Sequence, residues 1–465
     1  MKKSIKCTIA LLMSSITLVF ANSGPTYWQG YPSSNIMTVD KNSPIEIKNE
    51  NLTFDFSHEE NDSYSVQADV TAEYNMFNPT NEPIFVQMAF PFVERLNNIN
   101  YDDITITTDN IELDYEVYLG NSVDNHNGFS ENNEGDYNFE EIVNKISNDI
   151  YKAKSFSQDE VGRLYIFEIK PTTNEGIDFT VKFNYDHEKT NIIIQNFNSF
   201  SRDDGKVQIS SGCYEPQTAE IFVLGEDVEF SVAGYTIGSS KKETSLFTYE
   251  VTEKEIDVKT YLLDYLKIYT ENVNPISDIQ LYNLYASALD KYFEYNLGFC
   301  SEHDIFAASY DERVITLVYT VEFPPAAGQK VSVSYKTSGT MDKRETVLPQ
   351  YSFDYILNPA KNWSSFNNLN IKIITPEEAP YIIDSSIEFK RENNNVYSAS
   401  LKTLPEEDLS FTLYSKEEAT LLDKAEGRLN RSFGYFAPIV IVIAGIVTFI
   451  VIALIMGKIK KRNVL

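Results

Sequence analysis

Residues 66–90 read VQADVTAEYNMFNPTNEPIFVQMAF, and this stretch decides the fold class. From Val66 to Met76 every second residue is apolar, and polar residues occupy the positions between them. A period of two is typical of a β-strand that has one buried and one solvated face. The turn residues 78–81, Asn-Pro-Thr-Asn, come before a second alternating run from Ile84 to Phe90. The stretch therefore predicts two antiparallel strands joined as a β-hairpin.

Alternating runs recur along the rest of the chain. A second pair, Ile315–Phe323 and Val331–Tyr335, flanks a loop with two prolines and a glycine, and it predicts another hairpin. Short strands separated by turns favour β-sandwich architecture. Further alternating segments lie at 113–119, 179–185, 221–223, 228–232 and 409–413.

Two segments have a helical period instead. Isoleucines at 142, 146 and 150 share one helix face, which predicts a short helical insertion near 140–152. Between Ile256 and Tyr295 two apolar stripes predict a helical pair, with Pro275 and the candidate N-cap Ser277 between the helices.

Both ends of the chain carry targeting patterns. Three early lysines precede an apolar stretch at 8–20 and a small residue at Ala21, which predicts a signal peptide. The uncharged run Phe436–Met456 predicts a transmembrane helix, because about 20 apolar residues cross a bilayer. The basic residues at 458–462 would lie in the cytoplasm. We therefore expect a single-pass type I protein of the cell membrane with an extracellular ectodomain.

The predicted fold is mainly β: a β-sandwich-like ectodomain with a helical insertion and a helical pair, plus one C-terminal transmembrane helix. The predicted parts are a signal peptide (1–21), a β-rich ectodomain (22–255), a helical pair and junction (256–310), a second β-rich domain (311–415), a stalk that is helical or flexible (416–435), the transmembrane helix (436–456) and a basic cytoplasmic tail (457–465).

The formal net charge of −29 excludes one class of partner, since such a surface repels nucleic acid. The simplest interpretation is that the charge keeps the ectodomain soluble.

Sequence signatures of catalysis are missing. The chain has neither a nucleophile elbow nor a phosphate-binding loop, and its four histidines show no zinc-type spacing. Cys300 and His303 are close in sequence, but nothing around them matches a catalytic motif. The acidic segment Asn121–Asn138 is rich in oxygen ligands without the spacing of an EF-hand, so a polar loop is favoured over a calcium site. We predict no cofactor and no metal, and favour a protein that is not an enzyme.

Two further features leave alternatives open. Cys213 and Cys300 could form one disulfide or remain two buried thiols. Near the predicted mature N-terminus, Tyr27, Trp28 and Tyr31 could stack on a sugar or a peptide, or could cap a sheet edge.

Three segments carry a resemblance: GPTYW at 24–28, VTAEYNMFNPTNEPIFVQMAFPF at 70–92 and LNPAKNWSSFNNLNIKIITP at 357–376. Together with both termini they resemble uncharacterised, membrane-anchored surface proteins of Gram-positive bacteria. The segment 70–92 is also similar to the β-rich domain of the vault/inter-α-trypsin type. This resemblance implies a β-rich surface protein and supplies no catalytic residues. No metal-dependent adhesion motif D-x-S-x-S follows the segment, so a von Willebrand partner domain is not implied.

The function predicted from these features is that of an extracellular binding or structural surface protein with a protein or glycan partner. One alternative is a carboxylate-based hydrolase that faces the cell wall. Another is an accessory subunit that docks another membrane protein through the helical pair.

Overall fold

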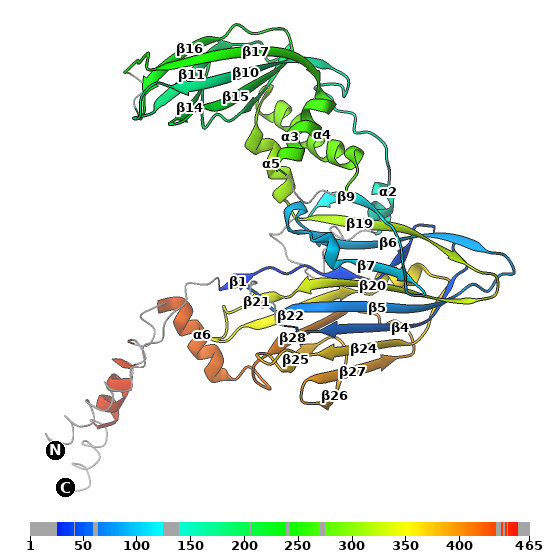
Figure 1. Cartoon of the computed structure of the whole chain (residues 1–465). Coiled ribbons are helices and arrows are strands. Elements are labelled where there is room, and N and C mark those ends of the chain that lie inside the picture. The colour runs from blue at the N-terminus through cyan, green and yellow to red at the C-terminus, as the bar shows by residue number, and fades with distance from the viewer. Residues whose placement is uncertain are drawn as a thin grey trace, which may run out of the picture. The chain divides into compact units, whose positions relative to one another are not determined.

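The computed structural model describes residues 26–40, 42–58, 64–123, 139–203, 206–238, 242–269, 275–433, 439, 442–443 and 445–453. Their contacts divide the chain into two discontinuous units (Figure 1). Unit 1 takes the described residues of Met1–Met88, Asp102–Leu113 and Thr320–Leu465, and unit 2 takes those of Ala89–Tyr101 and Asp114–Tyr319. The division thus differs from the predicted succession of two β-rich domains along the chain.

Unit 1 contains sheet B and most of sheet A. The order of sheet B is β26 (Lys390–Asn393), β27 (Val396–Leu401), β24 (Leu369–Ile374), β4 (Glu46–Asp55), β5 (Gln67–Phe77), β20 (Gly328–Ser338), β7 (Thr105–Thr108) and β8 (Ile111–Glu112), with β23 (Ser365–Phe366) beside β4. The unit 1 part of sheet A contains β1 (Tyr27–Trp28), β21 (Thr340–Asp342), β22 (Gln350–Ile356), β2 (Ser33–Ser34), β3 (Met37–Thr38), β28 (Leu409–Tyr414), β25 (Tyr381–Ser385) and the unit 1 ends of β6 (Ile84–Glu94) and β19 (Arg313–Phe323).

Aromatic side chains join the two sheets of unit 1. Phe54 of β4 meets Tyr355 of β22 and Phe411 of β28 edge to face, with ring centroids 6.0 and 5.2 Å apart. Phe56 and Phe353 pack in the same way at 4.8 Å. Burying such side chains stabilises the fold by roughly 1.5–3 kcal/mol each. The two sheets of unit 1 therefore pack as sandwich layers through the inward-facing side chains of their alternating strands.

Both hairpin predictions were wrong, although the strands exist. β5 lies in sheet B and β6 in sheet A, and β20 and β19 are divided between the same two sheets. The two connections hydrogen-bond to each other: the N–H of Asn78 donates to the carbonyl of Ala327 at 3.0 Å, and that of Ala326 to the carbonyl of Thr80 at 2.7 Å. The Asn78 side-chain amide also donates to the carbonyls of Glu82, Phe323 and Pro324. These bonds fix two adjacent sheet-crossing corners instead of two hairpins.

Unit 2 has its own sandwich and a group of helices (Figure 1). Tyr165, Phe167 and Ile169 from sheet C pack against Phe179 and Val181 from sheet D. The order of sheet C is β17 (Phe247–Asp257), β10 (Val161–Pro171), β15 (Gln217–Gly225), β12 (Thr190–Gln195) and β18 (Phe299–Ser301). The order of sheet D is β13 (Ser199–Asp203), β14 (Lys206–Cys213), β11 (Ile177–Asn184) and β16 (Ser231–Thr236). Also in unit 2 are β9 (Glu116–Ser122), which pairs with β19, the 3₁₀ turn η1 (Leu96–Asn98), and the helices α2 (Phe139–Lys145), α3 (Val258–Tyr269), α4 (Asp278–Tyr295) and α5 (Glu302–Tyr310).

The predicted helical pair is present as α3 and α4, and Ser277 is the N-cap of α4, since its side chain accepts from the N–H of Gln280. The predicted insertion helix is much shorter than expected, because α2 ends at Lys145. Beyond it, side chains of α4 take over the backbone hydrogen bonds. Asn283 accepts from the N–H of Tyr151 at 2.7 Å, and Asp290 accepts from the N–H groups of Lys154 and Ser155 at 3.0 and 2.9 Å.

The expected stalk contains α6 (Leu421–Phe433), and this helix packs on unit 1. Arg428 pairs with Glu345 at 3.1 Å, and Gly427 lies so close to the carbonyl of Glu345 that a Cβ there would be 2.5 Å from its oxygen. Within the expected stalk, the described residues Leu421–Phe433 are therefore helical.

The fold prediction was wrong about a membrane span. No helix in the described part of the chain is both long enough and apolar enough to cross a bilayer. Within the predicted span 436–456, the longest described helical run is 445–453, which is less than half of the roughly 20 residues that a crossing needs. The rest of that span, the predicted leader 1–21, the tail 457–465 and most of the acidic segment 121–138 lie outside the described residues.

One carboxyl group lies in the core of unit 1. A register shift between Ile47 and Asn49 in β4 brings Glu50 opposite Tyr74, and Glu50 is 0% exposed. Asn35 donates its amide to Glu50 Oε2 at 2.9 Å. Burial raises the pKa of Glu50 to about 7, while hydrogen bonds with Asn35, Tyr74 and Tyr355 act in the opposite direction. The carboxyl group therefore keeps its proton in the folded protein well above the pH at which it ionises in the unfolded chain.

This pKa shift predicts a pH-dependent loss of stability that Glu50→Gln removes. Between pH 4.5 and 7 the unfolded chain releases the proton and the folded chain keeps it, so the free energy of unfolding falls with rising pH, by about 3 kcal/mol for this group. Urea unfolding across that range checks it, read by tryptophan fluorescence, since Trp28 and Trp363 both belong to unit 1. The free energy of unfolding of Glu50→Gln, compared with that of the wild type, should therefore increase from pH 4.5 to pH 7. If the free energies of unfolding of the two proteins changed with pH in parallel, the raised pKa of Glu50 would be contradicted.

Candidate functional site

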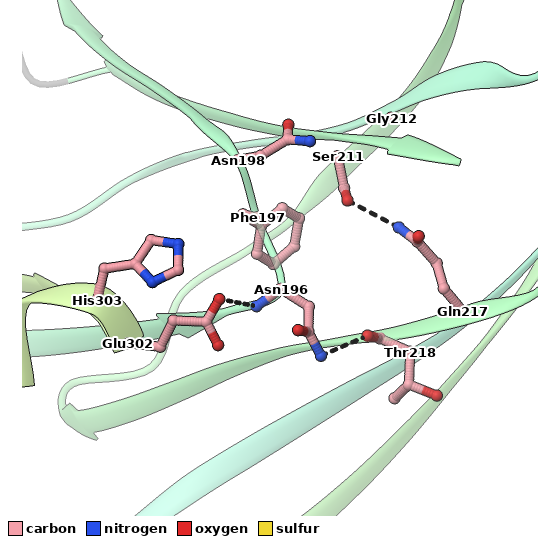
Figure 2. A pocket seen from close by; sticks show the side chains of 9 residues that line it. All are labelled: Asn196, Phe197, Asn198, Ser211, Gly212, Gln217, Thr218, Glu302 and His303. Carbon is pink, nitrogen blue, oxygen red and sulfur yellow. Dashed lines mark hydrogen bonds between the residues drawn. The ribbon is translucent and has the colours of Figure 1, made fainter. Parts of the chain in front are cut away.

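A cleft of about 430 Å³ lies within unit 2, where the two sheets of its sandwich meet the start of α5 (Figure 2). Its lining comes from four segments: the turn between β12 and β13, the end of β14, the start of β15 and the first turn of α5. The lining side chains are mostly amides and hydroxyls. They are Asn196, Phe197, Asn198, Ser211, Gly212, Gln217, Thr218, Glu302 and His303.

The turn from β12 to β13 forms one wall. Asn196 has a φ of 60°, a left-handed conformation that asparagine tolerates better than most residues. Its N–H donates to Glu302 Oε1 at 3.1 Å, and its side-chain amide donates to the carbonyl of Thr218 at 3.0 Å. Phe197 is 6% exposed and belongs to the sandwich core. The turn is therefore fixed on both sides, and its next residue, Asn198, is exposed at the cleft.

The first turn of α5 forms the opposite wall. Ser301 is the N-cap, and its hydroxyl and the Asp304 carboxylate form a reciprocal capping box. This cap fixes where the helix begins and so brings Glu302 and His303 to the cleft. Figure 2 shows both side chains on the α5 side, with Asn198 and Ser211 across from them.

The β14 and β15 side of the cleft is held by Gln217. Its amide donates to the hydroxyl of Ser211 at 2.7 Å and contacts the sulfur of Cys213 at 2.9 Å. Gly212 lies in open surroundings, since an added Cβ would meet its nearest atoms, in Asp178, Ile237 and Asn198, at 3.7–3.9 Å. A side chain at position 212 would therefore enter the cleft without striking the backbone.

The groups that remain for a ligand are neutral hydrogen-bonding groups. For the exposed side chains of Asn198 and His303, the described part of the chain offers no hydrogen-bond partner or ion pair. No Lys or Arg is among the described residues that line the cleft, and the Glu302 carboxylate already accepts a backbone N–H. Among the described residues no group of three or more His, Cys, Asp or Glu could hold a metal ion. The arrangement suits a ligand that exchanges several hydrogen bonds without carrying a negative charge.

A second cleft, of about 410 Å³, lies over the outer face of sheet B. Three of its amide and hydroxyl side chains bond to one another. Asn370 donates to Asn51 at 3.1 Å, and Ser400 donates to Asn370 at 2.9 Å. Asn370 and Ser400 of this cleft thus already have side-chain partners, whereas Asn198 and His303 of the first cleft have none among the described residues.

The residues predicted for ligand stacking do not line either cleft. Tyr27 and Trp28 form β1 and pair with Asp342 and Met341 of β21. The guanidinium of Arg344 lies over the ring of Tyr27, 4.1 Å from its centroid. The structure thus has the sheet-edge arrangement that the sequence left open, and one face of the Tyr27 ring is already covered; Tyr31, which follows, is half-buried.

Cys213 and Cys300 are both buried, free thiols. Cys213 ends β14 in sheet D and Cys300 lies in β18 of sheet C, so the two belong to different layers. Burial raises the pKa of Cys213 to about 11 and that of Cys300 well above its usual value, which keeps both thiols protonated. The possible disulfide is not formed, and neither sulfur is suited to act as a nucleophile.

Sequence reasoning had noted His303 but missed the rest of the cleft. The Ser-x-x-Asp pattern at 301–304 could have indicated the start of a helix there. Nothing in the sequence indicated that this helix would meet the turn at 196–198, about a hundred residues earlier.

Comparisons with known proteins give low similarity to solved structures. No family model and no curated protein matches the sequence. Among solved structures, a chain from Legionella pneumophila proposed to be a nutrient binding protein is 10% identical, with a TM-score of 0.36. The alignment covers 88% of this chain and 76% of that one.

Proposed function

We propose that this chain is a binding protein that works outside the cytoplasm, and that the unit 2 cleft takes a small, uncharged and hydroxyl-rich ligand such as a mono- or disaccharide. The observation that carries the proposal is the pair of uncommitted side chains, Asn198 and His303, at a cleft of about 430 Å³ lined by further amides and hydroxyls. Each sugar hydroxyl donates and accepts a hydrogen bond, which matches amide and imidazole groups. A cleft of this volume lies in the range of small-molecule sites.

Electrostatics favour a neutral ligand over an anionic one. The formal net charge is −29 and the described lining residues include no Lys or Arg, so none of them would offset the charge of a phosphate or a carboxylate. Glu302 is the one carboxylate among the lining residues that the structure describes, and its bond to Asn196 fixes the wall of the cleft.

A substitution at Gly212 tests the cleft. Gly212→Leu should weaken saccharide binding at least tenfold, because the new side chain fills space beside Asn198, and Asn198→Ala should weaken it by several fold through one lost hydrogen bond. Gly212→Ala is the matched control, since its Cβ finds only ordinary contacts. A glycan array followed by calorimetry with the best ligand measures the effect, and thermal unfolding verifies that each variant folds.

Two results would count against this proposal. One is the absence of any saccharide ligand for the wild type. The other is equal weakening by Gly212→Ala and Gly212→Leu. Turnover of a bound saccharide that is lost in Glu302→Gln would favour the hydrolase alternative instead.

Location outside the cytoplasm rests on the sequence of the leader, with its early lysines and the apolar stretch at 8–20. Deletion of residues 2–21 should keep the protein in the cytoplasm, because the export signal is then gone. Cell fractionation with immunoblotting measures this. The mature wild-type protein should begin at Asn22 on N-terminal sequencing, and a full-length N-terminus with cytoplasmic fractionation would contradict the location.

A further inference from the structure

The edge of sheet C is a long strand with uncovered side chains. β17 pairs with β10 over its whole length, Phe247–Asp257, and is the last strand of the described sheet (Figure 1). All eight residues from Thr248 to Glu255 are exposed, including Tyr249 at 47% and Val251 at 42%. An edge strand presents backbone N–H and C=O groups to any further strand that can align with it.

The side chains on one face of β17 are self-complementary. This face carries Thr248, Glu250, Thr252, Lys254 and Ile256 in that order, since side chains alternate along a strand. A two-fold axis through Thr252 would place Glu250 opposite Lys254 of a second copy, and Lys254 opposite Glu250 of that copy. The same axis pairs Thr252 with itself and Thr248 with Ile256. Opposite charges and paired threonines stabilise antiparallel neighbours.

The other face of β17 tolerates the same register. It carries Phe247, Tyr249 and Val251 in its first half and Glu253, Glu255 and Asp257 in its second half. The two-fold axis sets each acidic residue opposite an apolar one, so no like charges are directly opposed. Arg163 also lies 3.8 Å from Glu253 and offsets its charge.

Neighbouring registers are less favourable. Centring the pairing on Glu250 or on Glu253 would oppose that carboxylate to its own copy, which destabilises a strand pair. Centring on Val251 would lose both Glu–Lys pairs. The charge pattern of β17 thus selects one register out of the possible ones.

From this edge and its charge pattern we infer that β17 pairs antiparallel with β17 of a second copy of the chain, centred on Thr252, and joins the two C sheets into one continuous sheet. Such a pairing is isologous, because both copies use the same strand. It goes beyond the proposed ligand binding and does not depend on it. Charged residues also guard edge strands against pairing, and in that role their order along the strand would not matter.

Cysteine cross-linking tests the register directly in the full chain. Thr252→Cys should give a disulfide-linked dimer under mild oxidation, because residues directly opposite in an antiparallel pair have Cα atoms about 4.5–5.5 Å apart. Thr248→Cys is the matched control, since its two copies would lie about 26 Å apart along the strands. The two cysteines among the described residues, Cys213 and Cys300, are buried and should not react. Failure of Thr252→Cys to cross-link, or equal cross-linking of both variants, would overturn the inference.

A charge swap tests the pairing a second way. Glu250→Lys replaces two attractive pairs by two repulsive ones and should weaken the dimer at least about tenfold, and Lys254→Glu should do the same. The double variant Glu250→Lys with Lys254→Glu restores both pairs with reversed sign, so its dimer affinity should return to within about threefold of the wild type. Sedimentation velocity on the full chain measures this. A wild type that stays monomeric, or a double variant as weak as the single ones, would show that these charges only guard the edge.

Discussion

The ladder between β5 and β20 is the constraint on which unit 1 depends. It runs from Gln67 opposite Ser338 to Phe77 opposite Gly328 and joins segments about 260 residues apart in sequence. β4 pairs with β5 on its other side and β24 pairs with β4, so the sheet is assembled outward from this ladder. Because closing such a long loop costs chain entropy, the pairing must be stabilised by the core that its inward side chains form. Phe54 on β4 and its partners Tyr355 and Phe411 belong to that core.

In unit 2, helix α4 supports a segment of the chain that has no regular structure of its own. The chain leaves α2 without regular structure, and α4 satisfies its backbone groups with side chains on one face, Gln280, Asn283 and Asp290. Burial alone would raise the pKa of Asp290, but its hydrogen bonds from Lys154, Ser155 and Tyr151 lower it below the usual value, so the carboxylate stays charged and keeps accepting. α4 then leads through β18 into the capped start of α5, and that connection fixes one wall of the cleft.

The cleft and the β17 edge would bind their partners through different groups, side chains at the cleft and the backbone at the edge. At the cleft, well-bonded residues such as Asn196 and Gln217 hold their neighbours in place, so Asn198 and His303 can be offered to a ligand with little loss of conformational entropy. At the edge, the backbone offers the bonds and the side chains select the register. Both depend on the stability of the unit 2 sandwich, whose core includes Phe167, Phe179 and Ile221.

The sequence by itself determined the local elements. The alternation from Val66 to Met76 gave the strand β5, and the apolar stripes with Ser277 gave the helical pair and the cap of α4. These follow from periodicity and from hydrogen bonds within a few residues, which are local properties of the chain. Only the tertiary structure decided which strands pair, because a period of two is the same for a hairpin and for a strand that crosses to another sheet. It also decided that Glu50 enters the core, through a register shift that no sequence period shows, and that Asn198 and His303 meet at one cleft, since contacts between distant segments depend on the packing of whole layers.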